Sequence, residues 1–534
     1  MKAATLDNAG GTVQHAGSGT LSIDANTLNG QGGTLLGNGS LNITGQHTDL
    51  SKGATSAQRI SITTTDLSNA AGQLAATGVD ALHLQVGNRL DNSGGSIGSN
   101  GAVELSAGQF INSQGKLVAA GSGASTLKVD QLLDNSGGAL SSNGDLSVNA
   151  GQLNNAGGTV LTADEASLQL TVDGLLDNSS GGRVAAGGDL GVAADALDNR
   201  TGTIEHAGEG TLDIAVNALH GAGGKIIGNG NLKLQGESLD LQGATTQAKR
   251  LQVTAGSLTT ADGVLVSIGT DVLQLQVRDV LNNDRGTIAA NGALALEAGH
   301  LSNRGGTLSA AGSGDSLLQV DGELDNSDGT IASNAESLTL SSGSLVNEDG
   351  TVSHAGEGAL VLQTGKLDGQ RGTITSAGAL QLTAGQVDHR DATLNAKQLT
   401  VNAAGFDNRG GTVLGTGQQL NSITVQGTLD NGNGGTIASN GDLSLKAATF
   451  GNAGGKVQHA GTGTLSIDAT TLNGQGGTLL GNGALSITGQ HTVLGNGTTS
   501  AQRISITTTD LNNAGGQLSA TGSEALRLQV ANRL

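Results

Sequence analysis

The 534-residue chain contains no cysteine, proline, tryptophan or tyrosine, and only three phenylalanines. The absence of cysteine excludes disulfide bonds and thiolate-bound metals. Without large aromatic side chains, aliphatic and small residues must fill the interior. The absence of proline is expected where backbone N–H groups are committed to hydrogen-bonded ladders. The composition therefore points away from a disulfide-stabilised domain and toward an extensive β-structure.

Positive charge is also scarce, since 25 Lys and Arg residues face 45 Asp and Glu residues, a formal net charge of -20. Nucleic acids and anionic membranes attract basic surfaces, so we expect neither as a partner. No apolar run is long enough to span a bilayer, and no signal peptide begins at Met1, so we expect no membrane insertion by this segment. The chain begins and ends within a repeat, and we interpret it as an internal fragment of a longer protein.

Near-copies of one eight-residue stretch, Leu6–Val13, recur about every 21 residues along the chain. Other copies occupy residues 90–97, 153–160 and 406–413. We take the apolar residue that opens each copy as its anchor. The anchors run from Leu6 to Leu534, and we assign Leu50, Leu241 and Leu494 to this set.

Between the anchors, apolar and polar residues alternate with a period of two, as in Thr20–Asp24 and Asp145–Asn149. This alternation predicts half-buried strands, and Gly-Gly and Asn-Gly pairs predict the corners between them. One coil buries too little apolar surface to be stable alone, so neighbouring coils must stack. The sequence therefore predicts an all-β fold, a parallel β-helix (β-solenoid) of about 25 coils of roughly 21 residues, with two or three strands per coil.

A longer repeat lies on top of the 21-residue one. Four blocks of 84 residues occupy positions 6–90, 197–281, 345–429 and 450–534, and the first and last are almost identical. No linker or change of composition interrupts the repeat, so we expect one continuous domain over residues 1–534.

Asparagine recurs two residues after the anchor. Asn tolerates left-handed backbone, and its amide can bond the backbone or the next coil's amide. We predict a structural ladder; glycosylation or ligand contact is the alternative. The second coil of each block has glycine instead, at Gly30, Gly221, Gly369 and Gly474. The predicted ladder consists of Asn8, Asn69, Asn92, Asn112, Asn135, Asn155, Asn178, Asn199, Asn303, Asn326, Asn408 and Asn431.

Aspartate often precedes the ladder asparagine, and a row of carboxylates could hold Ca²⁺ or perform acid–base chemistry. The calcium-binding nonapeptide does not recur, so we interpret these residues as solvated turn residues. They are Asp7, Asp91, Asp134, Asp177, Asp198, Asp325 and Asp407.

Four histidines share one position in the repeat, namely His15, His206, His354 and His459. The closest two are about five coils apart, or ~24 Å at ~4.8 Å per coil, too far to share a metal ion. We interpret them as copies of one corner residue.

The sequence contains no Ser-His-Asp constellation, phosphate-binding loop or zinc-ligand spacing. We therefore expect no enzymatic activity, no cofactor and no metal.

The repeat unit, with good examples in Leu133–Gly151 and Leu429–Ala447, resembles the haemagglutinin repeats of filamentous haemagglutinin and of CdiA-type contact-dependent growth inhibition exoproteins. This resemblance implies a right-handed parallel β-helix from a Gram-negative bacterium, exported across the outer membrane to the cell surface by two-partner secretion. The implied partners are the outer-membrane transporter of that pathway and a target-cell receptor contacted by parts outside this segment.

Our leading hypothesis is a rigid stalk that projects a receptor-binding and toxin module in contact-dependent growth inhibition. The alternative is an adhesin whose β-helix itself attaches to host cells or other bacteria. The absence of Trp and Tyr counts against stacking on sugars and so favours the stalk.

Overall fold

The computed structural model describes residues 1–523 and 526–534, which form 45 strands and no helix. The described residues accordingly include no helix able to cross a bilayer. Residues 524 and 525, which fall in the last predicted block, lie outside the described residues. The chain divides into two compact units, Met1–Thr259 with Gly263–Ile268, and Thr260–Asp262 with Gly269–Leu534.

Unit 1 contains β1 to β24. Its long strands are β1 Lys2–Asp7, β3 Thr20–Asn29, β5 Ser40–Asp49, β7 Arg59–Ser68, β9 Leu82–Asp91, β11 Val103–Ile111, β13 Ser125–Asp134, β15 Leu146–Asn154, β17 Leu168–Asp177, β19 Leu190–Asp198 and β21 Thr211–His220. Its short strands are β2 Thr12–His15, β4 Thr34–Gly37, β6 Ala54–Ala57, β8 Gln73–Ala76, β10 Ser96–Ser99, β12 Lys116–Ala119, β14 Ala139–Ser142, β16 Thr159–Thr162, β18 Arg183–Ala186, β20 Thr203–His206 and β24 Val264–Ser267. Short and long segments merge in β22 Lys225–Asp240 and β23 Thr245–Thr259.

Unit 2 contains β25 to β45 and repeats this alternation. Its long strands are β25 Leu273–Asn282, β27 Leu294–Ser302, β29 Ser316–Asp325, β31 Leu338–Val346, β33 Ala359–Asp368, β37 Asn421–Asp430, β39 Leu443–Gly451, β41 Thr464–Asn473 and β45 Arg527–Arg533. Its short strands are β26 Thr287–Ala290, β28 Thr307–Ala310, β30 Thr330–Ser333, β32 Thr351–His354, β36 Thr412–Gly415, β38 Thr436–Ser439, β40 Lys456–His459 and β44 Gln517–Ala520. The merged strands are β34 Thr373–Asp388, β35 Thr393–Asp407, β42 Thr478–Val493 and β43 Thr498–Asn512.

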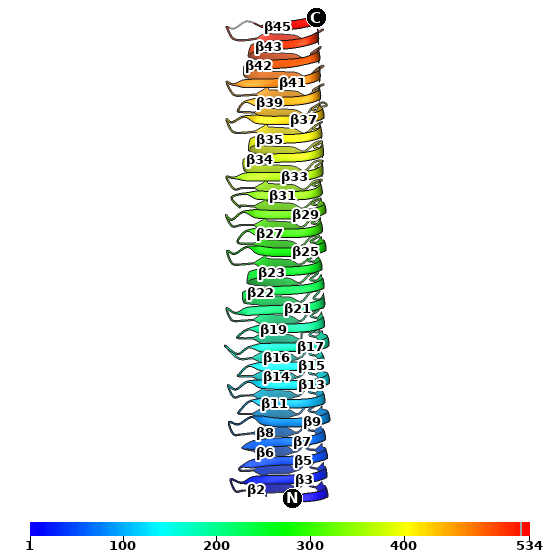
Figure 1. Cartoon of the computed structure of the whole chain (residues 1–534), viewed down its shortest axis with the longest axis vertical. Helices are drawn as coiled ribbons and strands as arrows, with labels where there is room; N and C mark the ends of the chain where they lie inside the picture. The colour runs from blue at the N-terminus through cyan, green and yellow to red at the C-terminus, as the bar shows by residue number, and fades with distance from the viewer. Residues whose placement is uncertain (524–525) are drawn as a thin grey trace. The chain divides into compact units, whose positions relative to one another are not determined.

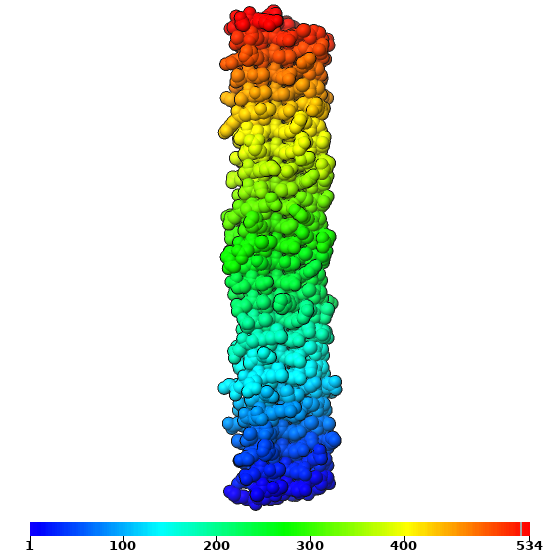
Figure 2. Space-filling view, turned by 90° about the vertical axis from the view of Figure 1, so that its right-hand side faces the viewer, coloured from blue at the N-terminus to red at the C-terminus, as the bar shows by residue number. Residues whose placement is uncertain are grey.

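In each unit, a strand pairs in parallel with the equivalent strand of the next turn. Short β10 pairs with β12, aligning Ile97 with Leu117, and long β11 pairs with β13, aligning Leu105 with Leu127. One short and one long strand therefore make one turn, and equal positions of successive turns lie side by side (Figure 1). Within each unit, the surface in Figure 2 changes colour gradually, so each patch consists of residues close in sequence. The predicted parallel β-solenoid is confirmed.

The interior of each turn is filled by the alternating aliphatic residues. In β13, Leu127, Val129 and Leu133 are at most 1% exposed. A register shift between Val129 and Leu132 where β13 pairs with β15 introduces a bulge, and a bulged strand bends. The bend lets both halves of one strand direct side chains inward, which accounts for the two or three strand segments expected per coil.

Three predicted anchors are wrong. The register aligns Leu28 with Thr48, and Leu472 with Thr492, so these threonines occupy the anchor position. Likewise, Leu219 aligns with Leu239. The residues assigned as anchors, Leu50, Leu241 and Leu494, lie two residues later, at the position of the ladder asparagine. The period was misread because an aliphatic residue had been expected at every anchor, and two of the three true anchors are threonines.

The corner that follows a long strand combines a residue with positive φ and, directly after it, a close approach to the preceding turn; glycine meets both demands at the corner after β9, whereas Ala244 and Ala392 occupy the second position at two other corners. Gly94 has φ of 60°, and the Gly95 N–H donates to the Asn92 carbonyl at 2.9 Å, a turn with left-handed backbone at its third residue. Gly95 lies so close to the preceding turn that a Cβ on it would be 2.2 Å from the Asn69 carbonyl oxygen. The first position tolerates other residues, such as Gln114 with φ of 54°, because its side chain would point outward.

We therefore expect Gly95→Ala to destabilise its turn by about 1–3 kcal/mol, because the new methyl group overlaps the neighbouring backbone. Gly98→Ala is the matched control, since a Cβ there would meet nothing within 4 Å. Urea unfolding followed by circular dichroism, with hydrogen exchange for the local effect, measures both. Equal stability of the two variants would contradict the close packing of the corner.

Candidate functional site

The most regular polar feature of the interior is a ladder of asparagine side chains, each directly after a long strand. Asn92 is fully buried, and its Nδ2 donates to Oδ1 of Asn112 in the next turn at 2.7 Å. The same amide reaches the carbonyl oxygens of Gly95 at 3.3 Å and Lys116 at 3.1 Å. Because one amide both donates and accepts, identical residues in successive turns bond one another.

In unit 1, this ladder is continuous from Asn69 to Asn199, with every Nδ2 to Oδ1 distance 2.7 Å. Unit 2 contains two shorter runs with the same distance. The members in order are Asn69, Asn92, Asn112, Asn135, Asn155, Asn178 and Asn199 in unit 1, then Asn283, Asn303, Asn326 and Asn347, and Asn408, Asn431 and Asn452 in unit 2.

Eleven of the twelve residues named from the sequence thus lie in these runs, and Asn8 does not. Its Nδ2 donates instead to the carbonyl oxygens of Gly11 at 3.4 Å and Thr34 at 3.3 Å. Four further asparagines at the ladder position were not named, although the rule of two residues after the anchor finds them. They are Asn283, Asn347, Asn452 and Asn513.

In the first, second and fourth blocks, a complementary pair of residues interrupts the ladder in the second and third turns; the third block has Gly369 and His389 there. A Cβ on Gly30 would lie 3.2 Å from Leu50 Cδ2, so glycine makes room for the leucine of the next turn. Gly221 with Leu241, and Gly474 with Leu494, repeat this arrangement at 3.1 and 3.3 Å. Leucine offers no hydrogen-bond donor, and in unit 1 Oδ1 of Asn69 is consequently buried without a partner.

Two residues of other types occupy ladder positions in unit 2 and supply a donor. Thr260 Oγ1 donates to Asn283 Oδ1 at 2.8 Å, and His389 Nδ1 lies 2.6 Å from Asn408 Oδ1. His389 also contacts Phe406 edge-on, with ring centroids 5.7 Å apart. Burial lowers the pKa of His389, opposed by the bond to Asn408, so the imidazole is neutral and carries its proton on Nδ1. Residue type alone gave no signal for these two positions.

The four histidines of one register are not brought together. His206, His354 and His459 end short strands with their side chains buried, whereas His15 is partly exposed and its Nδ1 lies 3.0 Å from the Gly17 carbonyl. Three of them are therefore interior residues and not corner residues.

The aspartates before the ladder each perform the same local task. Asp91 Oδ1 accepts a hydrogen bond from the Ser93 backbone N–H at 2.9 Å, closing an Asx turn. The other six sequence-derived aspartates, Asp7, Asp134, Asp177, Asp198, Asp325 and Asp407, accept the equivalent bond. Within residues 1–523 and 526–534, no group of three or more His, Cys, Asp or Glu residues is placed to hold a metal ion.

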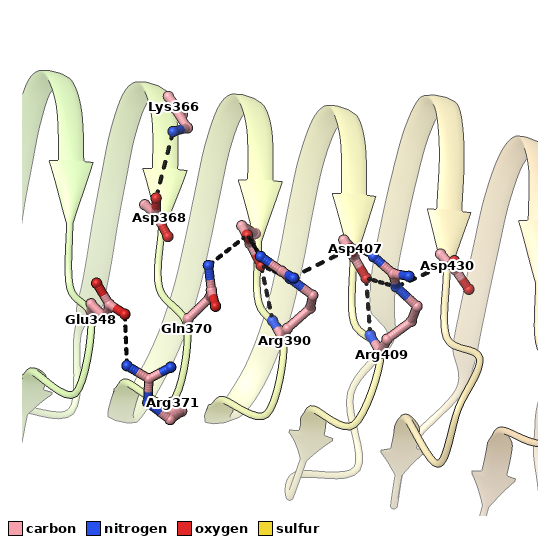
Figure 3. A network of polar contacts seen from close by, with 10 residues as sticks. Glu348, Lys366, Asp368, Gln370, Arg371, Arg390, Asp407, Arg409 and Asp430 are labelled. Carbon is pink, nitrogen blue, oxygen red and sulfur yellow. Dashed lines mark hydrogen bonds and ion pairs between the residues drawn. The ribbon is translucent and has the colours of Figure 1, made fainter.

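A charged network follows the same corner in unit 2 (Figure 3). Arg390 lies 2.6 Å from Asp388 in its own turn and 3.8 Å from Asp407 in the next. Arg409 repeats this geometry, 2.6 Å from Asp407 and 3.7 Å from Asp430. Asp388, Asp407 and Asp430 occupy equal positions of successive turns, and each arginine lies between two of these carboxylates, where its charge offsets their repulsion.

The arginines hold these carboxylates in the ionised state. The hydrogen bond from Arg390 lowers the pKa of Asp388, with burial opposing it. At Asp407, burial alone would raise the pKa, but the hydrogen bonds and charge of Arg409 together outweigh burial and lower it.

Three recesses lie on the surface of unit 1. The largest, about 940 Å³, is bordered by Asp164, Glu165, Asp189, Glu205 and Glu209 together with Arg183, which pairs with Glu205 at 3.0 Å. The others have volumes of about 440 Å³ around Thr48 and about 460 Å³ around His83. Each is bordered by polar residues of several consecutive turns. The sequence predicted none of these recesses, because each is formed by residues of several turns whose alignment is known only from the structure.

For the ladder, we expect Asn135→Ala to lower the local free energy of unfolding by about 1–3 kcal/mol, because Asn112 loses its acceptor and Asn155 its donor in a buried site. Asn149→Ala, on the exposed face of β15, should change it by less than about 0.5 kcal/mol. Hydrogen exchange of the backbone amides in residues 112–155 measures the difference. A loss confined to residue 135 itself would argue against coupling between turns.

For the charged network, Arg409→Gln should lower the free energy of unfolding only slightly, because the pair is partly exposed to solvent, and less still in 1 M salt. A carboxylate whose pKa is lowered in the folded state contributes stability when the pH is above its ordinary pKa of 3.8. It loses this contribution as the pH falls through its pKa in the folded state. The difference from wild type should therefore shrink toward pH 2 in urea unfolding. Lys397→Gln removes the same charge from an exposed position and should show neither dependence.

Comparison with known families supplies the context for this architecture. The family model described as haemagglutinin repeat matches nearly the whole chain, at residues 2–22, 16–94, 67–122, 120–180, 165–212, 207–277, 268–328, 313–398, 375–433, 420–466 and 460–523. Searches of curated proteins and of solved structures give no match. With these matches from one end to the other, the chain belongs to the haemagglutinin-repeat family.

Proposed function

We propose that the chain is the stalk of a secreted bacterial surface exoprotein, which holds a separate receptor-binding and toxin module away from the cell in contact-dependent growth inhibition. The observation that carries the proposal is that the regularly repeated polar side chains form their hydrogen bonds inside the solenoid itself. The ladder asparagines and the corner aspartates all bond within the stack of turns. The asparagines connect successive turns, and the aspartates close the corner of their own turn.

The family membership supports the export route in this proposal. Haemagglutinin repeats suggest two-partner secretion across the outer membrane of a Gram-negative bacterium, with a dedicated transporter as partner. A chain without cysteine can pass through an oxidising compartment without forming disulfides. Turns that contact mainly their neighbours can fold one after another as they emerge.

A second candidate function is adhesion by the solenoid surface itself. The observation in its favour is the group of polar recesses on unit 1, of about 940, 440 and 460 Å³. The absence of Trp and Tyr removes the residues that usually anchor interfaces, which weighs toward the stalk.

Binding of the purified, labelled chain to host cells and to Gram-negative bacteria separates the two candidates. A stalk should show no saturable binding, whereas an adhesin should saturate. In the parent exoprotein, deletion of residues 91–133 removes two whole turns, because Leu90 and Leu133 occupy the same position. For a stalk, this deletion should leave binding by the distal module intact. Deletion of residues 91–143, which removes β14 Ala139–Ser142 as well and so takes part of a third turn, should shift the later strands against their neighbours and disrupt folding.

A further inference from the structure

Two buried histidines in equivalent positions form no hydrogen bond of ordinary geometry with either ring nitrogen, although the Gly188 backbone lies near the ring of His206. They are His206 at the end of β20 in unit 1 and His459 at the end of β40 in unit 2, each 1% exposed. A buried imidazole without a partner gains nothing from its polarity and cannot accommodate a proton without leaving a charge unpaired in the interior. Neither residue takes part in the ladder or in the charged network.

The third buried histidine of this register provides an internal comparison. His354 Nδ1 lies 3.2 Å from Ser376 Oγ of the next turn, and its Nε2 lies 3.0 Å from the Ala335 carbonyl. The residues aligned with His206 and His459 in the next turn are Gly228 and Gly481. His354 therefore differs from the other two in two contacts, a hydroxyl in the next turn and a carbonyl oxygen in the preceding one, and glycine at positions 228 and 481 removes the first of them.

The same turns are also where the asparagine ladder is missing. After Asn199, the next two ladder positions of unit 1 are Gly221 and Leu241, which cannot continue the chain of amide bonds. After Asn452, Gly474 and Leu494 interrupt the ladder of unit 2 in the same way. Each unpartnered histidine is thus followed by turns that lack Asn–Asn bonds between them.

The charged groups near these histidines are few and mostly engaged. His206 is near Asp189, whose Oδ1 accepts the Thr211 N–H at 2.7 Å. Glu205 and Glu209 of its own strand and loop border the outer recess. The paired strands β18 and β22 contribute Arg183 and Lys225 at their starts, three residues before the register partners of the histidine.

The surroundings of His459 are similar. Asp442 lies nearby, and its Oδ1 accepts the Thr464 N–H at 2.8 Å. The paired strand β38 and the paired part of β42 contain no charged residue, and Lys456 begins the strand of the histidine itself.

We propose that residues 203–241 and 456–494 are acid-labile segments of the solenoid, which open locally when His206 and His459 take up protons in mild acid. Opening exposes the imidazole to water, where the charged form is stable. Each turn contacts mainly its neighbours, so a segment can open without unfolding its unit. The device is a local pH-sensitive weak point, repeated once in each unit.

The direction of the pH dependence follows from the burial of the two imidazoles. Burial lowers the pKa of His206 and of His459. The charge of Asp189 and the Gly188 backbone oppose it at His206, and the charge of Asp442 opposes it at His459. A histidine whose pKa is lowered by burial stabilises the closed state when the pH is above its ordinary pKa of about 6.5. This contribution is lost as the pH falls from about 6.5 toward the lowered pKa of the closed state. One proton taken up on opening raises the open population by up to roughly tenfold per pH unit in that range.

Hydrogen-exchange mass spectrometry of the whole chain at pH 7.5 and pH 5.5, corrected for intrinsic exchange, tests the proposal. Between these two pH values, peptides covering 203–211 and 456–464 should lose protection by up to about tenfold in total, because the loss begins only near pH 6.5. Peptides covering 351–359 around His354 should not. An equal response of all three segments, or no response, would overturn the proposal.

Three variants make the test specific to the histidines. Gly228→Ser supplies the hydroxyl that His354 has, and a Cβ there would meet Ala248 Cβ at an ordinary 3.7 Å. It should reduce the acid response at 203–211 and leave that at 456–464 unchanged in the same molecule. Ser376→Gly should create an acid response at 351–359. His206→Leu should abolish the pH dependence at 203–211, whatever its effect on basal protection; persistence of the dependence in this variant would refute the proposal.

Discussion

Parallel pairing between successive turns imposes one constraint on all other features of this protein: each turn must present the same backbone outline to the turn before it and the turn after it. In the aligned strands β10 and β12, every residue lies beside its equivalent one turn later. Side chains at equal positions then stack at about 4.8 Å. A position is therefore filled well only by a residue that tolerates a copy of itself, or by a residue that complements its neighbour.

Asparagine satisfies this constraint because its amide is both donor and acceptor, and the buried ladder from Asn69 to Asn199 is the direct result. Leucine and valine satisfy it inside the turn through dispersion alone. Charged side chains do not tolerate copies of themselves, because equal charges in successive turns repel. Arg390 and Arg409 offset this repulsion, since each pairs with a carboxylate of its own turn and one of the adjacent turn. Where the ladder stops, glycine and leucine form a complementary pair, as at Gly30 and Leu50.

The sequence predicted the features that repeat in every turn, namely the strands, the Gly-Gly corner and the ladder position, because periodicity reports them directly. It failed where a turn differs from its neighbours. Leu50, Leu241 and Leu494 were taken as anchors because they are aliphatic, yet the register places Thr48, Leu239 and Thr492 there. Thr260 and His389 continue the ladder with another chemistry, and the partner of His354 depends on Ser376 in the next turn. These relations exist only after the turns are aligned, which a single repeat unit cannot reveal.

The same constraint bears on how such a chain can change in length. An insertion or deletion of part of a turn would shift every later residue against its neighbour, placing leucine beside asparagine and separating each arginine from the carboxylates that it pairs with. A change by whole turns preserves all of these relations. The four blocks of 84 residues, each beginning and ending at an anchor, are additions of this permitted kind. The number of turns can therefore vary freely while the cross-section stays fixed, which is the property required of a spacer and not of a binding site whose residues must keep one arrangement.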